Sequence, residues 1–316
     1  MYKDKSVAVV VPAHNEEKLI SHVIETMPDF VDHIVVVDDL SKDRTAEIVN
    51  EHVNKSDGRI IMICLKKNHG VGGAIAEGYK WCRDHEIDAT AVMAGDAQMD
   101  PEDLQGLLDP VVKGEVDYTK GNRLFTGEAW QKIPKSRYMG NAALSLLTKI
   151  ASGYWHVADS QTGYTVANLK ILKTLDLDGI YKKYGMPNDI LVKLNIYNFK
   201  VRDVEVKPIY GIGEKSGIKP LLVIPRFSWL LTKLFFHRMF QKYVIRDFHP
   251  LVFFYILSFI LNIIGIGLTI RMLVIWANVG SIPSINALAV FFSFIVGFQM
   301  LLFAMWFDMD SNKHLR

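Results

Sequence analysis

The first part of the chain alternates between short apolar runs and longer segments with helical patterning. The apolar runs are rich in β-branched residues and have the length of buried strands. Alternation of strand and helix predicts an α/β domain over residues 1–215, with a mostly parallel sheet and helices on both faces. The expected strands are Ser6–Val11, His33–Asp38, Ile60–Leu65 and Ala89–Ala94, and the expected helices are Glu16–Met27, Thr45–Asn54 and Gly73–Arg83.

Two long segments near the C-terminus carry no charge. They are Leu251–Ile270 and Ile285–Phe307. A helix needs about 20 apolar residues to cross the hydrocarbon core of a bilayer, and both segments are long enough. Gly280 and Pro283, which break helices, lie between them. We therefore expect two transmembrane helices, at about residues 251–275 and 284–307 of an anchor over 250–310, rather than a buried hairpin in a soluble core.

The segment before this anchor, residues 216–249, is basic and aromatic. No acidic residue lies between Glu214 and Asp247, whereas Lys and Arg are interleaved there with Phe, Trp and Tyr. This composition favours amphipathic juxtamembrane helices that lie in the headgroup layer. Because the polar positions do not share one helical face, we expect two short helices. An ordinary basic linker helix is the alternative.

The charges that flank the two apolar segments predict their orientation. The turn at residues 276–285 has no Lys or Arg, while the tail 311–316 carries Lys313 and Arg316. By the positive-inside rule, the large N-terminal domain, the tail and both termini face the cytoplasm. The expected location is the cell membrane or an endomembrane, with two membrane passes.

Overall charge and cysteine content exclude several classes of protein. The 36 Lys and Arg residues nearly balance the 34 Asp and Glu residues, for a net charge of +2. A protein that wraps nucleic acid carries a larger positive excess, so nucleic acid is not an expected partner. The chain has two cysteines, Cys64 and Cys82, which excludes a disulfide-stapled fold and a four-cysteine zinc site.

Polar loops follow the four expected strands. Ligands of parallel α/β sheets bind beyond the carboxyl ends of the strands, so these loops predict a nucleotide pocket. The glycine-rich third loop lacks the Gly-Lys-Ser/Thr ending of an NTPase, and the first loop lacks the glycines of a dinucleotide fingerprint. The loops are Pro12–Glu16, Asp38–Ser41, Asn68–Gly73 and Gly95–Pro101.

Motifs in these loops resemble those of family 2 glycosyltransferases. That family has the GT-A fold, a Rossmann-like, mostly parallel sheet with flanking helices. With the basic segment and the hairpin, the whole chain resembles membrane-anchored polyprenyl- and dolichyl-phosphate glycosyltransferases. The matching segments are Val9–Glu17, Val37–Asp39 with Ser41, Asp43 and Thr45, Asn68–Gly70 with Gly72 and Gly73, and the metal-and-diphosphate motif Asp96–Pro101.

The resemblance implies a divalent cation, Mg²⁺ or Mn²⁺, held by Asp96 and Gln98. The family motif is usually Asp-x-Asp-x-Gln, and Ala94 replaces its first Asp. Diphosphate oxygens and water must therefore complete an octahedral shell. Lys215 lies in a segment that resembles the loop closing over the diphosphate. The implied nucleotide-sugar site comprises Pro12, Ala13, Asn15, Glu16, Asp38, Asp39, Asn68, Gly72, Asp96, Ala97 and Lys215.

The resemblance also implies acceptor and catalytic residues. Arg123, Arg137 and Asn141 match, by motif order, the residues that hold the acceptor phosphate in similar enzymes. Arginine suits phosphate because its planar fork makes bidentate hydrogen bonds. Asp159 opens a stretch that resembles the sugar-site motif, and Asp189 matches an acidic helix start in many relatives. With Asp96 and the two arginines, they are the candidate catalytic residues.

The expected reaction is metal-dependent transfer of a hexose from a nucleotide-diphosphate sugar to polyprenyl or dolichyl phosphate. The resemblance implies inversion at the anomeric carbon. We favour a UDP-sugar donor, with GDP-mannose as the alternative. A homo-oligomer is also considered, because relatives with such hairpins often associate.

Two other functions stay open. A polysaccharide- or glycolipid-synthesising transferase would use a sugar hydroxyl as acceptor and would need a base, with Asp159 or Asp189 as candidates. A noncatalytic membrane scaffold is the other alternative, and the replacement at Ala94 is the observation in its favour.

Overall fold

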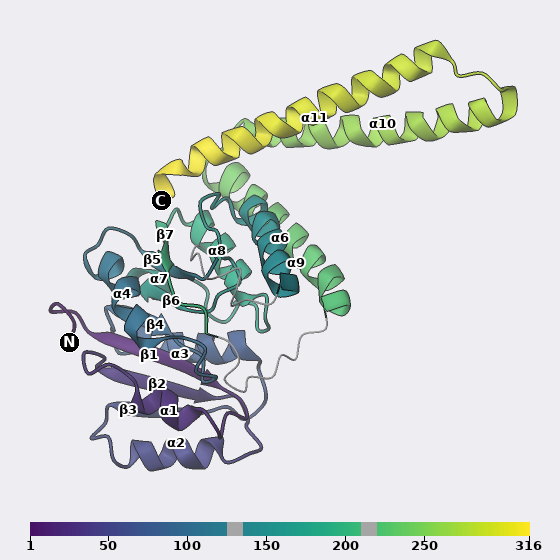
Figure 1. The fold of residues 1–316 in the computed structure, drawn as a ribbon. Coiled ribbons are helices and arrows are strands. Elements are labelled where there is room, and N and C mark those ends of the chain that lie inside the picture. The colour runs from purple at the N-terminus through teal and green to yellow at the C-terminus, as the bar shows by residue number, and fades with distance from the viewer. Residues whose placement is uncertain (125–134, 210–219) are drawn as a thin grey trace. The chain divides into compact units, whose positions relative to one another are not determined.

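The computed structural model describes residues 1–124, 135–209 and 220–316, the side chains of 136–137 and 220–224 excepted. The chain divides into two compact units, residues 1–235 with 315–316, and residues 236–314 (Figure 1). The first unit contains the predicted α/β domain. The second contains the two predicted apolar helices.

A mixed sheet forms the centre of the first unit. Its strands are β1 (Val7–Ala13), β2 (His33–Asp38), β3 (Ile60–Cys64), β4 (Ala89–Val92), β5 (Tyr118–Asn122), β6 (Thr165–Asn168) and β7 (Val201–Glu205). Among the described residues their order is β3-β2-β1-β4-β6-β5-β7. Strand β6 runs antiparallel to β4 and β5, and the other neighbouring pairs are parallel. The predicted mostly parallel sheet is therefore confirmed.

Helices cover both faces of this sheet because successive strand residues point to opposite sides. In β1, Val7, Val9 and Val11 pack with α1, α2 and α4, while Ala8 and Val10 pack with α3, α7 and α8. The sheet thus carries an apolar core on each face. The helices of this unit are α1 (Ile20–Glu25), α2 (Thr45–Val53), α3 (Val71–Asp84), η1 (Pro101–Asp103), α4 (Leu104–Val112), α6 (Lys135–Ser152), α7 (Leu169–Thr174) and α8 (Met186–Ile196).

The basic segment forms one long helix rather than two short ones. It folds into α9 (Pro220–Phe240), which continues as the π-helical turn η2 (Gln241–Arg246). Packing against α8 accounts for the difference, because Leu230 and Leu234 are buried against Val192 and Ile196 of that helix. Trp229 on the same helix is 73% exposed, which leaves an aromatic side chain for the predicted membrane contact.

The second unit contains the predicted pair of apolar helices. They are α10 (Leu251–Val279) and α11 (Ser284–Asn312), followed by the short turn η3 (Lys313–Leu315). Figure 1 shows α10 and α11 running alongside each other. A Cβ atom at Gly297 would lie 2.7 Å from the Asn262 side chain, so a glycine permits the close approach. Most large apolar side chains of both helices are exposed, and both helices are long and apolar enough to cross a membrane.

Buried polar side chains join the basic segment to α11 within the second unit. The fully buried Arg238 guanidinium makes two hydrogen bonds to the Asp308 carboxylate, at 2.7 and 2.9 Å. Tyr243 Oη donates to Asp308 Oδ1 at 2.7 Å, and Lys242 Nζ donates to Asn312 Oδ1 at 2.7 Å. Buried charges need such partners, so the network fixes which residues of α11 meet this segment.

Asn312→Ala is expected to lower the unfolding free energy of the second unit by about 1–3 kcal/mol. The buried Lys242 ammonium loses this acceptor, and Tyr243 Oη loses the N–H that Asn312 donates. Thermal unfolding of the full chain in detergent measures the change. Asp310→Ala is the matched control, because Asp310 lies in the same helix and its ion pair with Lys313 of η3 is exposed and contributes little. Equal stability of the two variants would contradict a structural role for the cluster.

Candidate active site

Hydrogen bonds join the loops that follow β1 and β2. The Asn15 amide donates to Ser41 Oγ at 2.9 Å, and the Lys42 amide donates to Asn15 Oδ1 at 2.8 Å. Asn15 has a φ of 59°, a left-handed conformation that Asn adopts more readily than most residues. The Glu16 amide donates to Thr45 Oγ1 at 2.8 Å. The two predicted loops therefore form one surface at the carboxyl edge of the sheet.

Buried residues of β1 and β2 form the floor under this surface. Pro12 and Ala13 are the last residues of β1, and Ala13 lies opposite Asp38 at the end of β2. The Asp38 carboxylate is buried and accepts the Ser41 amide at 3.2 Å. The structure thus brings these predicted residues together.

The carboxylate of Asp39 holds the loop after β3. Its two oxygens accept the backbone amides of His69 and Gly70, at 2.6 and 2.8 Å. Asn68 Nδ2 also donates to the Asp39 carbonyl at 3.3 Å. Asp39 is 3% exposed, so in this arrangement its side chain organises the third loop.

Gly72 allows the start of α3 to pack closely against the backbone of residues 181–182. A Cβ atom there would lie 2.1 Å from the Tyr181 carbonyl oxygen. The Gly72 amide donates to the Lys182 carbonyl at 3.0 Å. This glycine therefore permits the close approach of the backbone at residues 181–182.

Negative side chains gather where the first, second and fourth loops meet. Burial raises the pKa of Glu16 to about 7, and the charges of Asp96 and Asp43 add to this effect. Asp96 Oδ1 accepts the Gln98 amide at 3.1 Å. Ala97, between them, has a φ of 58°, so the chain turns tightly here. The turn presents the predicted metal ligands on one short segment.

The residues present fit a divalent cation that also binds diphosphate oxygens. Asp96 and Gln98 offer a carboxylate and an amide oxygen, which are donor types that Mg²⁺ and Mn²⁺ accept. The described part of the chain has no group of three or more His, Cys, Asp or Glu placed to hold a metal. Burial raises the pKa of Glu16 and the charge of Asp96 adds to this effect, so a cation bound at Asp96 would also stabilise the ionised form of Glu16.

An arginine and a buried aspartate form an ion pair at the end of β5. Arg123 Nε donates to Asp159 Oδ2 at 2.8 Å, and Arg123 Nη2 donates to Asp159 Oδ1 at 3.3 Å. The Asp159 side chain is fully buried, while the Arg123 side chain is 22% exposed. Burial raises the pKa of Asp159, but the charges of Arg123 and Lys120 and the hydrogen bonds from Arg123 together hold it below its ordinary value. Asp159 therefore orients Arg123.

Asp189 also forms an ion pair inside the structure. It lies in the first turn of α8, where its carboxylate accepts Lys193 Nζ at 2.7 Å and the Tyr181 amide at 2.9 Å. Asn188, beside it, accepts Gln161 Nε2 at 3.1 Å, so the start of α8 contacts the loop after Asp159.

Three further predicted residues are described to different extents. Asn141 lies in α6 and is half-buried. Arg137 lies in the same helix, but its side chain is outside the described residues, and Lys215 is outside them altogether. The predicted roles of these residues stay predictions.

Sequence reasoning missed Lys120 and Asp203. Lys120 is fully buried in β5, and its cross-strand partner on β7 is Asp203. A lysine inside a strand that should be covered on both faces was the available signal. No signal in the sequence pointed to Asp203, because its partner Lys120 lies far away in the sequence.

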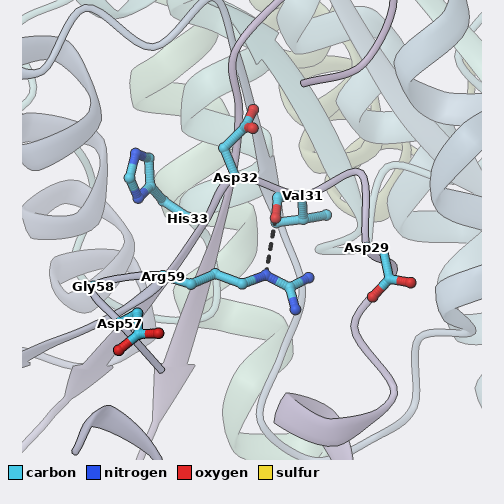
Figure 2. A pocket seen from close by; sticks show the side chains of 7 residues that line it. All are labelled: Asp29, Val31, Asp32, His33, Asp57, Gly58 and Arg59. Carbon is cyan, nitrogen blue, oxygen red and sulfur yellow. Dashed lines mark hydrogen bonds between the residues drawn. The ribbon is translucent and has the colours of Figure 1, made fainter. Parts of the chain in front are cut away.

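A hollow lies at the amino-terminal edge of the sheet, opposite the predicted site (Figure 2). It has a volume of about 370 Å³ and is formed around the starts of β2 and β3. Arg59 in this hollow donates to the backbone carbonyls of Val31 and Pro28, at 3.0 and 2.6 Å. The Asp32 carboxylate accepts the Met1 amine and the Val7 amide. These polar groups close the edge of the sheet, away from the predicted site.

A mostly parallel α/β sheet with acidic and amide side chains at its carboxyl edge is the arrangement expected of the GT-A fold. The family described as Glycosyl transferase family 2 matches residues 8–176, more than half of the chain. The chain therefore belongs to this family.

Curated relatives include enzymes that act on lipid phosphates. The chain is 29% identical over 219 residues to a UDP-N-acetylglucosamine--dolichyl-phosphate N-acetylglucosaminyltransferase of Methanococcus voltae, covering 66% of this chain and 87% of the relative. It is 29% identical over 187 residues to an undecaprenyl-phosphate mannosyltransferase of Micrococcus luteus, covering 58% and 75%.

A solved structure supports the fold. Glucosyl-3-phosphoglycerate synthase of Mycobacterium tuberculosis, in complex with Mn²⁺, UDP and glucosyl-3-phosphoglycerate, matches with a TM-score of 0.53 at 19% identity. The match covers 74% of this chain and 80% of that one. At this identity the likeness establishes the fold alone.

Proposed function

We propose that this chain transfers a hexose from a nucleotide-diphosphate sugar to polyprenyl or dolichyl phosphate. The observation that carries the proposal is the union, in one chain, of a family 2 domain and two long apolar helices. A water-soluble acceptor requires no such helices, whereas a lipid phosphate is presented at a bilayer surface. The acceptors in the names of the two relatives support the same class.

The proposed donor is a UDP-sugar, with GDP-mannose as the alternative. The relative from Methanococcus voltae is named for UDP-N-acetylglucosamine, and that from Micrococcus luteus for mannose. The donor would bind at the carboxyl edge of the sheet, as nucleotides do in such folds. The proposed nucleotide-sugar residues are Pro12, Ala13, Asn15, Glu16, Asp38, Asp39, Asn68, Gly72, Asp96, Ala97 and Lys215.

Asp96 and Gln98 would hold Mg²⁺ or Mn²⁺. When bound, the cation neutralises the charge that develops on the nucleoside diphosphate as it leaves. The hydrogen bond from the Gln98 amide orients the Asp96 carboxylate for this role. When ionised, the carboxylate of Glu16 would add to the attraction of the site for the cation that the donor needs.

Arg123 and Arg137, with Asn141, would hold the acceptor phosphate in line with the anomeric carbon. A phosphate monoester is largely ionised at neutral pH, so this acceptor needs no strong base. A sugar hydroxyl would need one. Both candidate bases, Asp159 and Asp189, are buried and ion-paired, which favours the phosphate acceptor over polysaccharide or glycolipid synthesis.

The proposed location is a membrane, with the family 2 domain and both termini on the cytoplasmic face. The exposed apolar surfaces of α10 and α11 and the basic, aromatic α9 support membrane attachment. A noncatalytic scaffold rests on Ala94 alone, and the fit of Asp96 and Gln98 to a cation speaks against it.

A donor panel tests the proposal. The purified full-length chain in detergent would be incubated with polyprenyl phosphate, Mg²⁺ or Mn²⁺, and radiolabelled UDP-N-acetylglucosamine, UDP-glucose or GDP-mannose. One donor should give label in an acid-labile lipid fraction that disappears without polyprenyl phosphate. Label in a polymer, or in no product with any donor, would contradict the proposal.

A further inference from the structure

A buried lysine lies beside the Arg123–Asp159 ion pair. Lys120 is in the middle of β5, two residues before that strand ends, and it is fully buried. In the parallel register of β5 and β7 it lies directly opposite Asp203. Lysine is almost never fully buried unless it is paired, so this position calls for an explanation.

Lys120 holds the loop that carries Asp159. Its ammonium donates a hydrogen bond to the carbonyl oxygen of Thr162. Asp159, three residues earlier in the same loop, accepts the Gln161 amide at 3.1 Å and the side chain of Arg123. The loop is therefore tied to β5 at one end by Lys120 and at the other by Arg123.

Asp203 connects the same two segments from β7. Its Oδ2 atom accepts the Ala158 amide at 2.6 Å and Asn122 Nδ2 at 3.0 Å. Ala158 precedes Asp159, and Asn122 precedes Arg123. Asp203 Oδ1 is buried without a hydrogen bond among the described residues. The positive charge of Lys120 stabilises the buried Asp203 carboxylate instead.

The charges of this group balance at neutral pH. Burial lowers the pKa of Lys120 to about 8, against the attraction of Asp159 and Asp203, so the ammonium is still mostly protonated at pH 7. Burial raises the pKa of Asp203 to about 6, which leaves it mostly ionised. Two cations, Lys120 and Arg123, thus face two carboxylates.

We propose that Lys120 is a positioning residue for the acceptor phosphate, which holds the Asp159 loop against β5 and thereby fixes the guanidinium of Arg123. This role rests on the proposed function, in which Arg123 binds the phosphate of a polyprenyl acceptor. Lys120 itself is buried and acts through Arg123. Its loss therefore weakens acceptor binding and leaves donor binding nearly unchanged.

Lys120→Met in the full-length enzyme tests the proposal, because methionine has a similar length and no charge. The KM for polyprenyl phosphate should rise about 10-fold or more, since a hydrogen bond from a charged group is lost. The Kd for the donor, measured by calorimetry, should change less than about twofold. Lys120→Gln keeps one N–H donor for Thr162 and should recover part of the acceptor KM.

Thr119→Val is the matched control. Thr119 is also fully buried in β5, and its hydroxyl donates to a backbone carbonyl, that of Leu107, at 2.7 Å on the other face of the sheet. The Thr119→Val substitution removes a buried hydrogen bond to a backbone carbonyl but does not affect the Asp159 loop. The KM for polyprenyl phosphate should therefore stay near that of the wild type.

Several outcomes would overturn the proposal. An unchanged acceptor KM in Lys120→Met and Lys120→Gln would do so, as would an equal rise in Thr119→Val. Failure of both Lys120 variants to fold, while Thr119→Val folds, would assign Lys120 to the fold alone. A wild-type enzyme that does not use polyprenyl phosphate would instead overturn the proposed function, and this role with it.

Discussion

Asp96→Asn is expected to reduce sugar transfer about 10²- to 10³-fold, the range seen when one preorganised group that stabilises developing charge is removed. The substitution removes the negative charge that would hold the cation under the diphosphate. It keeps an oxygen that can accept the Gln98 amide, so the turn at residues 96–98 should persist. Initial rates of transfer, read with circular dichroism, separate lost chemistry from lost fold.

Asp100→Asn is the control for this experiment. Asp100 lies four residues away, and its carboxylate accepts the Glu102 amide at the start of η1. The variant loses a nearby negative charge but no proposed metal ligand, so most activity should remain. Near-normal turnover of Asp96→Asn in the presence of EDTA would contradict the metal role.

Arg123→Ala is expected to lower the efficiency with the lipid acceptor by about 10- to 100-fold, because a hydrogen bond between charged groups is typically worth about 1.5–3 kcal/mol. The structure adds a second effect. Asp159 would remain fully buried without its guanidinium partner, which typically costs about 3–5 kcal/mol of stability. Acceptor kinetics and thermal unfolding measure the two effects separately.

Arg123→Lys distinguishes charge from geometry at the same position. Lysine keeps a cation beside Asp159 but cannot make the bidentate fork, so stability should recover more fully than acceptor use. A large drop in donor affinity, with unchanged dependence on the acceptor, would move Arg123 to the donor side and contradict the assignment. The same acceptor loss is expected for Arg137→Ala.

The elements that the sequence predicted well have local signals. Apolar runs such as His33–Asp38 and the chargeless segments of the hairpin identify strands and long helices without knowledge of their partners. Strand β6 lacks such a signal, because four residues are too few to show a period. The single helix α9 was also missed, since its buried face is defined by contacts with α8 rather than by its own pattern.

The candidate site was predictable at the level of loops but not of individual contacts. Motifs placed Asn15, Asp39 and Asp96 at one edge of the sheet, and the structure brings their loops together. Whether a carboxylate faces a ligand or binds loop amides depends on distant segments. Asp39 meets amides about 30 residues away, and Lys120 meets Asp203 across a strand pair, so neither arrangement could be read from spacing.

The mass of the lipid product distinguishes transfer of a sugar to polyprenyl phosphate from the alternative reactions. The purified enzyme would receive polyprenyl phosphate and the active nucleotide sugar, and the lipid fraction would be analysed by mass spectrometry. We expect a product heavier than the acceptor by one sugar residue, with no added phosphate, and an equal amount of nucleoside diphosphate. A product that carries an additional phosphate, or a lipid of unchanged mass while the sugar enters a polymer, would contradict it.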